Sequence, residues 1–304
     1  MKINKILLGS IFTLTSVVAS CTCVEEQTTT TDSVHKVCST GEKTKGIDIS
    51  KYQGNIDWVE VKNSGIEFAF ARVSDGANNI DKTFSSNWIS MKKAGLIRGS
   101  YQYFRPSQDA SEQAYLFLNI LNQNGGLELN DFGMVVDIEE TEGLKSEDIN
   151  SALGQWLEVV EKETNRIPII YTGPSFWDSN KLDSAFSKYP LWVAHYTTSC
   201  PLVPDAWKDW SIWQYSGSGS VPGINTSTDL NVFNGNRLEL EMFINPVVAD
   251  SGIDVITNDV IIQDSGTDEK ADYDAIVDAN NIEVSIDSAK EILQQSGGCS
   301  ITSR

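Results

Sequence analysis

The sequence predicts an α/β fold in which a largely parallel sheet closes into a (β/α) barrel. Short apolar runs alternate with helical stretches over residues 45–245, and polar side chains stand where several of these runs end. Strand, helix, strand at this rhythm is typical of a parallel sheet covered by helices, and about 200 residues can form a single core. A barrel of this kind gathers its functional side chains at the carboxyl ends of its strands.

Seven segments have the character of strands. Each is short, apolar or alternating, and rich in β-branched or aromatic residues. Polar residues lie at or near the ends of several of them, including Asp48, Asp137, Tyr171 and His195. The predicted strands span residues 46–49, 68–71, 97–104, 133–138, 167–171, 191–194 and 211–214.

Two helices can be predicted between these strands. Phe84, Trp88 and Met91 mark one helical face, and Gly95 is placed to cap its end. A second helix is predicted to begin with Ser146 as its N-cap. Its apolar stripe consists of Ile149, Leu153, Trp156, Leu157 and Val160.

An open, doubly wound sheet is the alternative to a closed barrel. Such a sheet is expected to carry a glycine-rich phosphate loop after its first strand. Residues 48–54 read DISKYQG, which is not a loop of that kind. The sequence therefore favours the barrel.

The most informative segment reads VVDIEE over residues 135–140. Side chains alternate between faces along a strand, so Asp137 and Glu139 share one face and Ile138 takes the other. Two acids on one face repel each other, and paired carboxylates are what acid/base chemistry on a glycosidic bond requires. The alternative is a solvated strand end with unrelated acids.

Residues 1–20 are predicted to be a lipoprotein signal peptide. The basic Lys2 and Lys5 precede an apolar stretch over residues 6–18 that is too short to span a membrane. Residues 18–21, VASC, resemble a bacterial lipobox, in which the chain is cut before the cysteine and Cys21 carries the lipid. An ordinary cleaved signal peptide is the alternative.

Both ends of the chain differ from the barrel segment. Residues 21–44 lack an apolar period and are predicted to be a flexible tether. Residues 246–304 form an acidic extension, either a small module or a weakly ordered tail. With no second long apolar stretch, the mature protein is expected to be anchored to a membrane through Cys21, or free.

Cysteine usage fits an exported protein, in which disulfides persist. If Cys21 carries a lipid, an even number of cysteines remains, and the sequence leaves three pairings open. The absence of a C-x-x-C motif and the presence of two histidines argue against a zinc site. The remaining cysteines are Cys23, Cys38, Cys200 and Cys299, and the histidines are His35 and His195.

The formal net charge of −19 argues against nucleic acid as a partner. Phosphate binding relies on clustered lysine and arginine. The same charge removes electrostatic attraction toward an anionic polymer. Such a substrate would be held by shape, hydrogen bonds and aromatic stacking.

Several segments in order resemble glycoside hydrolase family 25, the Chalaropsis-type muramidases. Each match is weak alone, but their number and order over residues 45 to about 235 are specific. The sequence departs from the family at residues 102–103, QY, where a histidine is common. The matching segments are 45–54 KGIDISKYQG, 99–105 GSYQYFR, 136–139 VDIE, 168–172 PIIYT, 191–196 LWVAHY, 213–216 WQYS, 223–224 GI and 229–233 DLNVF.

The resemblance implies an irregular, flattened barrel of the TIM type that hydrolyses peptidoglycan. The bond cut would be the β-1,4 bond between N-acetylmuramic acid and N-acetylglucosamine. Glu139 would be the general acid, with Asp48, Asp137 and Asp229 lining the same groove. Neighbouring negative charges raise a carboxyl pKa, which suits a group that must stay protonated. Without the resemblance, Asp229 would be interpreted as a turn residue.

The role of Asp137 stays open between nucleophile and partner of the substrate's 2-acetamido group. Residues two apart in a strand have Cβ atoms roughly 6.6 Å apart. That spacing lies between those of retaining pairs (about 5 to 5.5 Å) and inverting pairs (about 6.5 to 9.5 Å), so it does not fix the stereochemistry. The acetamido role with net retention is favoured.

Residues at or near the strand ends are the candidates for substrate binding. Tyr171 and Trp213 are the strongest, because aromatic rings at strand ends can stack on sugars. His195 is interpreted as a hydrogen-bonding residue of the groove, since no serine or cysteine nucleophile motif accompanies it. The full set is Tyr103, Tyr171, Trp192, His195, Trp213 and Gln214.

The sequence thus predicts an exported, monomeric muramidase that acts on peptidoglycan strands without a metal or cofactor. It would be tethered at Cys21, at an outer membrane or cell surface rather than an inner membrane, or secreted. A hydrolase of chitin-like polymers and a catalytically silent glycan-binding barrel are the alternatives. The presence of both Asp137 and Glu139 argues against the silent barrel.

Overall fold

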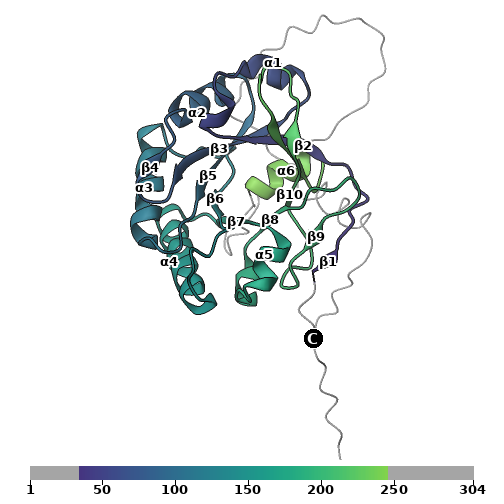
Figure 1. The fold of residues 1–304 in the computed structure, drawn as a ribbon. Coiled ribbons are helices and arrows are strands. Elements are labelled where there is room, and N and C mark those ends of the chain that lie inside the picture. Colours follow the sequence, from purple (N-terminus) through teal and green to yellow (C-terminus); the bar gives the residue numbers. More distant parts are fainter. Residues whose placement is uncertain (1–33, 246–304) are drawn as a thin grey trace, which may run out of the picture. The chain divides into compact units, whose positions relative to one another are not determined.

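The computed structural model describes residues 34–245, and Figure 1 shows their arrangement. The predicted signal peptide at residues 1–20, the lipidation site Cys21, Cys23, Cys299 and the acidic extension at residues 246–304 lie outside the described residues.

Eight strands close into a barrel, as the sequence predicts. Neighbouring strands run parallel except at β11, which is antiparallel to both β10 and β2. The parallel pairing of β2 with β3 completes the ring, and β4 (Asn79–Ile80) extends β3 as a hairpin. The barrel strands are β2 (Thr44–Ile49), β3 (Phe68–Asp75), β5 (Ile97–Tyr103), β6 (Met134–Asp137), β7 (Ile169–Thr172), β8 (Leu191–Ala194), β10 (Ile212–Gly219) and β11 (Thr228–Phe233).

Helices connect most of the parallel strands and cover the outside of the barrel (Figure 1). The predicted face of Phe84, Trp88 and Met91 is buried on α2, and Gly95 follows its C-cap with a φ of 76°. The helices are α1 (Trp58–Asn63), α2 (Phe84–Lys93), α3 (Ala110–Gln123), α4 (Ser146–Thr164), α5 (Pro174–Ser179) and α6 (Arg237–Ile244), with short 3₁₀ turns at Lys51–Gln53 and Ser184–Lys188.

The predicted N-cap of α4 is wrong by one residue. Lys145 occupies the cap position, and Ser146 is the first helical residue. The Ser146 hydroxyl donates to the carbonyl of Asn180 instead of receiving a backbone N–H of its own helix. The predicted apolar stripe of this helix is buried as expected.

Two apolar layers build the core. One lies between the strands and the helices, and the other fills the barrel interior. Phe68 and Phe70 of β3 point inward, and a Cβ at Gly46 or Gly99 would meet their rings at 2.1 Å. Glycine on both neighbouring strands therefore makes room for the two rings. Leu240 and Ile244 of α6 belong to the interior layer, so α6 closes the amino-terminal end of the barrel.

Residues 34–44 do not behave as the flexible tether that the sequence predicts. His35–Lys36 form β1, which pairs with β9 (Leu202–Val203). A disulfide joins Cys38 to Cys200, and this is one of the three pairings left open. The indole of Trp210 also donates to the carbonyl of Val37. The prediction failed because these contacts link residues far apart in the chain, which local composition cannot show.

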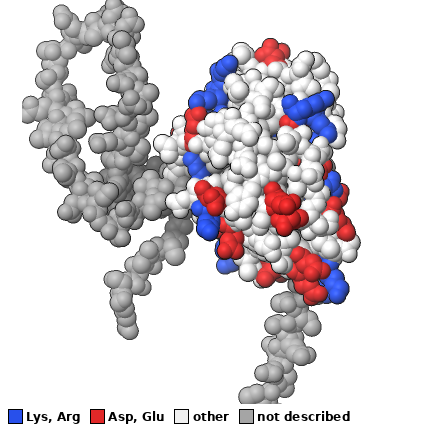
Figure 2. Space-filling view, turned by 90° about the vertical axis from the view of Figure 1, so that its left-hand side faces the viewer, with Lys and Arg blue, Asp and Glu red and all other residues white. Residues whose placement is uncertain are grey.

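Charged side chains are interspersed on the face of the barrel shown in Figure 2, which displays no broad basic area. Within residues 34–245, no helix combines the length and hydrophobicity that a membrane span requires. Histidine, cysteine, aspartate and glutamate side chains in this part of the chain form no group of three suited to a metal ion.

Candidate active site

Four carboxyl groups meet at the carboxyl end of the parallel strands. Asp48 lies near the end of β2, Asp137 ends β6, and Glu139 follows two residues later. Asp229 lies near the start of β11 and is the direct register partner of Asp48. Because β11 is antiparallel, its beginning reaches the barrel end at which the other strands finish.

Asp48 is buried and bound by two amides. Its Oδ2 accepts hydrogen bonds from Gln214 Nε2 at 2.9 Å and Asn231 Nδ2 at 2.7 Å. Burial, followed by the charge of Asp229, raises the pKa of Asp48 from 3.8 to about 8. Asp48 is therefore protonated near neutral pH despite the two N–H donors, which favour its charged form.

Asp229 is the more exposed member of this carboxyl pair. Partial burial raises its pKa, whereas the hydrogen bond with Asp48 lowers it. The same hydrogen bond raises the pKa of Asp48. The proton of the pair therefore resides on Asp48, and Asp229 accepts the hydrogen bond that Asp48 donates.

Asp137 has a buried carboxyl group with an unsatisfied atom. The side chain is 6% exposed, and its Oδ1 has no hydrogen-bond partner among the described residues. Burial raises the pKa of Asp137 well above its usual value, and the charges of Glu139 and Asp48 add to the effect. A buried acceptor without a partner is costly, and a ligand donor in the groove would satisfy it.

Glu139 stands at the mouth of the barrel and is open to solvent. Desolvation of its carboxyl group by the surrounding protein, followed by the charge of Glu140, raises its pKa. The Tyr103 hydroxyl hydrogen-bonds to Glu139 and to Glu140, and its bond to Glu139 opposes that rise. The Arg105 guanidinium lies 4.4 Å from the Tyr103 ring and pairs with Glu140. Glu139 therefore combines access to a polymer with a raised pKa.

Tyrosine hydroxyls and a tryptophan indole hold the two amide side chains that contact Asp48. Tyr171 and Tyr196 both donate to Gln214 Oε1, at 2.9 and 3.0 Å. The Trp192 indole donates to Asn231 Oδ1 at 2.8 Å. The site as a whole places the solvent-accessible Glu139 beside the buried carboxyl group of Asp137. Two carboxyl groups placed in this way can hydrolyse a glycosidic bond.

Residues 47–224 match the family model described as glycosyl hydrolases family 25. The chain belongs to this family. It is therefore a glycoside hydrolase, as the order of its motifs predicts.

The family 25 hydrolase is similar in sequence to several curated proteins and in structure to solved lysozymes. It is 42% identical over 207 residues to the uncharacterized protein YegX of Escherichia coli K12, covering 66% of this chain and 74% of that protein. It is 34% identical to Lysozyme M1 of Streptomyces globisporus, covering 64% and 69%. The crystal structure of a lysozyme from Streptomyces coelicolor superposes with a TM-score of 0.64 at 32% identity, covering 69% of this chain and 99% of that one.

Tyr103, Tyr171 and Gln214 of the family 25 hydrolase, which the sequence predicts to bind substrate, lie around the acids. The structure does not place Trp192 or Trp213 where a sugar could stack. Trp192 is 1% exposed inside the barrel, packed on Phe70. Trp213 lies on the outer side of the barrel wall within the helix-facing core, because its neighbour Gln214 takes the inward position.

His195 of the hydrolase contacts the segment around β9. Its Nδ1 accepts the backbone N–H of Leu202 on β9, and its backbone carbonyl receives the Trp213 indole. Burial and the nearby charge of Lys36 lower the pKa of this imidazole. The Nδ1 atom of His195 is thus engaged with β9, and the side chain helps to fix the segment that carries Cys200.

Sequence reasoning missed several residues around the acids of the hydrolase. Asn231 is two residues from Asp229 on β11, so strand alternation would have placed it on the same inward face. Tyr101 and Arg72 lie close to the cluster: burial, followed by the charge of Asp48, raises the pKa of Tyr101, and the charge of Arg72 opposes the rise at Asp137. Strand β11 itself was not among the predicted strands, although DLNVF alternates polar and apolar residues.

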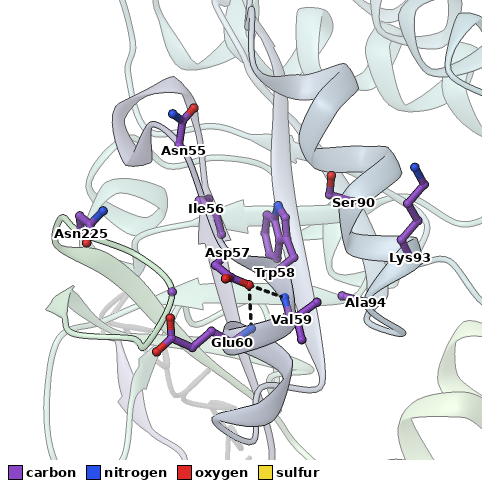
Figure 3. Close-up of a pocket in the computed structure, with 11 residues that line it drawn as sticks. Asn55, Ile56, Asp57, Trp58, Val59, Glu60, Ser90, Lys93, Ala94 and Asn225 are labelled. Atoms are coloured by element: carbon purple, nitrogen blue, oxygen red, sulfur yellow. Dashed lines mark hydrogen bonds between the residues drawn. The ribbon is translucent and has the colours of Figure 1, made fainter.

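A separate surface hollow of about 640 Å³ lies between the start of α1, the end of α2 and Gly223–Asn225 (Figure 3). None of the four acids lines it. The Asp57 carboxylate in its wall accepts the backbone N–H groups of Val59 and Glu60, capping α1. The Asp57 carboxylate thus serves as the cap of α1, and the hollow is distinct from the active site.

Proposed function

We propose that this family 25 hydrolase is a lysozyme, an N-acetylmuramidase that cuts the β-1,4 bond between N-acetylmuramic acid and N-acetylglucosamine in peptidoglycan. Relatives named lysozyme and N,O-diacetylmuramidase support this substrate class. The observation that carries the proposal is the accessible Glu139 beside the buried Asp137, whose Oδ1 has no hydrogen-bond partner within residues 34–245. A polymer can reach the acid, while the second carboxyl group lies protected beneath it.

Glu139 is proposed as the general acid. Its raised pKa keeps a proton available, which it gives to the oxygen of the leaving sugar as the glycosidic bond breaks. In the second step the resulting carboxylate takes a proton from the attacking water. Tyr103 holds the side chain through its hydroxyl.

Asp137 is proposed as the partner of the 2-acetamido group of muramic acid. Its free Oδ1 can accept the acetamido N–H, which turns the acetamido oxygen toward the anomeric carbon. That oxygen forms a bond to the anomeric carbon on the face opposite the leaving group as the glycosidic bond breaks. Water then attacks the same carbon from the face that the leaving group has vacated and breaks its bond to the acetamido oxygen, which gives net retention. Direct attack by Asp137 is the alternative retaining route.

The activity is tested by mass spectrometry of fragments released from purified peptidoglycan. The wild type should release fragments with reducing-end muramic acid, and Glu139→Gln should lower the rate by about 10²- to 10⁴-fold, the contribution of general acid catalysis. The control is Glu147→Gln, an exposed glutamate on α4 whose side chain is 74% accessible. Equal release by the wild type and Glu139→Gln would refute the assignment. Chitin oligomers as a parallel substrate test the chitinase alternative.

Two further measurements address the role of Asp137. Proton NMR of the first product should show the β-anomer, and an initial α-anomer would contradict both retaining routes. Peptidoglycan whose muramic acid has lost its N-acetyl groups should resist cleavage if the acetamido oxygen is the nucleophile. Cleavage at an unchanged rate would instead assign the attack to Asp137.

We further propose that the protein is exported and anchored through a lipid on Cys21. The Cys38–Cys200 disulfide supports export, because disulfides persist outside the reducing cytosol. The lipobox-like residues before Cys21 support the anchor. Cys21→Ser should move the protein from the membrane fraction to the soluble fraction and abolish incorporation of labelled palmitate. Membrane retention of the unlabelled variant would contradict the anchor.

A further inference from the structure

Asp48 receives both of its amide hydrogen bonds on one oxygen. Gln214 Nε2 and Asn231 Nδ2 converge on Oδ2. An amide side chain can present either its NH₂ group or its carbonyl oxygen to a neighbour, and the two ends differ little in shape. Each amide therefore needs a second contact that decides which end faces Asp48.

Trp192 supplies this contact for Asn231. An indole N–H can donate but cannot accept, so the atom it meets at 2.8 Å must be the carbonyl oxygen Oδ1. The NH₂ group of Asn231 then has to face Asp48. Trp192 cannot turn away, because it is 1% exposed and packs on Phe70 and Tyr171 with ring centroids 4.5 and 4.9 Å apart.

Gln214 is oriented in the same sense by different groups. The hydroxyls of Tyr171 and Tyr196 both lie within hydrogen-bond distance of Oε1, which leaves Nε2 to face Asp48. With Oδ2 occupied by two donors, the other oxygen of Asp48 is left to carry the proton shared with Asp229. The barrel interior thereby determines the geometry of the carboxyl pair.

We infer that Trp192 is a positioning residue of the active site: its indole N–H fixes the orientation of Asn231, so that Asp48 always meets an N–H donor and its proton lies on the side of Asp229. The inference rests on the proposed function in assigning Asp48 and Asp229 to the reaction. It gives Trp192 a role in place of the predicted contact with sugar.

The fixed amide has an electrostatic consequence. An N–H donor stabilises the ionised form of Asp48 more strongly than its protonated form. If the indole N–H were absent, Asn231 could turn its carbonyl oxygen toward a protonated Asp48 and stabilise that form. The Asp48 pKa would then rise. The Asp48 carboxyl group faces its partner Asp229. The other titratable or charged groups around these two carboxyl groups are Asp137, Glu139, Tyr101, Tyr171, Tyr196 and Arg72.

The test is a pH titration of the aspartate side-chain carboxyl carbons by ¹³C NMR, with Asp48→Asn used to assign the Asp48 signal. In Trp192→Phe the Asp48 midpoint should move upward by roughly half a pH unit to one unit, the scale of one hydrogen bond. The matched control is Trp177→Phe. Trp177 is equally buried, and its indole N–H has no acceptor among the described residues. Its variant should leave the midpoint unchanged.

Benzothienylalanine at position 192 provides a second variant, because it keeps the bicyclic ring and replaces only the N–H. It should reproduce the upward shift with little loss of stability. An unchanged Asp48 midpoint in both folded variants would overturn the inference. The titration contains no substrate, so an inactive wild type would refute the proposed function while leaving this result to stand on its own.

Discussion

Asp48 and Asp229 are register partners on β2 and β11, two strands that run in opposite directions. This pairing places two carboxyl groups side by side at the rim of the barrel, where they share a hydrogen bond. Burial of Asp48 and the greater exposure of Asp229 decide which of them holds the proton. A carboxyl group that stays protonated to about pH 8 has consequences for stability as well as for catalysis.

Stability should fall as pH rises, and Asp48→Asn should weaken this dependence. The folded protein holds a proton on Asp48 up to about pH 8, whereas the usual pKa of this group is 3.8. Between these values the unfolded chain binds fewer protons, so unfolding becomes easier with each pH unit. The variant should flatten the slope by about 1 kcal/mol per pH unit in urea unfolding from pH 4 to 8. Asp148→Asn, an exposed carboxyl group on α4, should keep the wild-type slope.

Glu140→Gln should move the alkaline limb of the activity profile to lower pH. The Glu140 charge raises the pKa of Glu139, second only to desolvation. Without that charge, Glu139 loses its proton earlier, and the limb of kcat/KM should shift by less than about one unit. Glu142→Gln removes a carboxylate that also pairs with Arg105 and serves as the control. A limb that stays in place in Glu140→Gln would argue against Glu139 as the acid.

Loss of the Cys38–Cys200 disulfide should lower thermal stability. The bond links residues 162 positions apart, and long closed loops restrict the unfolded chain most. The double variant with Cys38→Ser and Cys200→Ser should lose about 2–4 kcal/mol, or roughly 5–10 °C in Tm. Calorimetry with and without a reducing agent checks this. Reductant should destabilise the wild type and leave the double variant unaffected.

Tyr196→Ala should weaken substrate binding, whereas Trp213→Phe should not. Tyr196 is 61% exposed beside the acids, and its hydroxyl contacts Gln214. Loss of a sugar contact of about 1.4 kcal/mol would raise KM tenfold. Trp213 is 7% exposed and packs on Trp210 and Tyr215, so its variant should lower stability and keep KM within about twofold. A raised KM in Trp213→Phe together with an unchanged KM in Tyr196→Ala would contradict this prediction and assign the sugar contact to Trp213.

Local patterns were sufficient for most elements of the barrel. Alternating and apolar runs located the parallel strands, and the spacing of Phe84, Trp88 and Met91 located α2. Alternation also placed Asp137 and Glu139 on one face. The antiparallel β11 was missed because a glycine- and serine-rich stretch precedes it, and residues 34–44 were misjudged because their partners lie more than 150 positions away.

The sequence by itself determined the family and the barrel, because these follow from the order of its motifs and the period of its strands. The tertiary structure alone decided how the acids differ. Burial raises the pKa of Asp48 and leaves it protonated beside the more exposed Asp229. The antiparallel direction of β11 places Asp229 opposite Asp48. The tertiary structure also turned Trp192 inward and Trp213 outward. Desolvation and hydrogen-bond partners depend on contacts between distant residues, which no local pattern in the chain encodes.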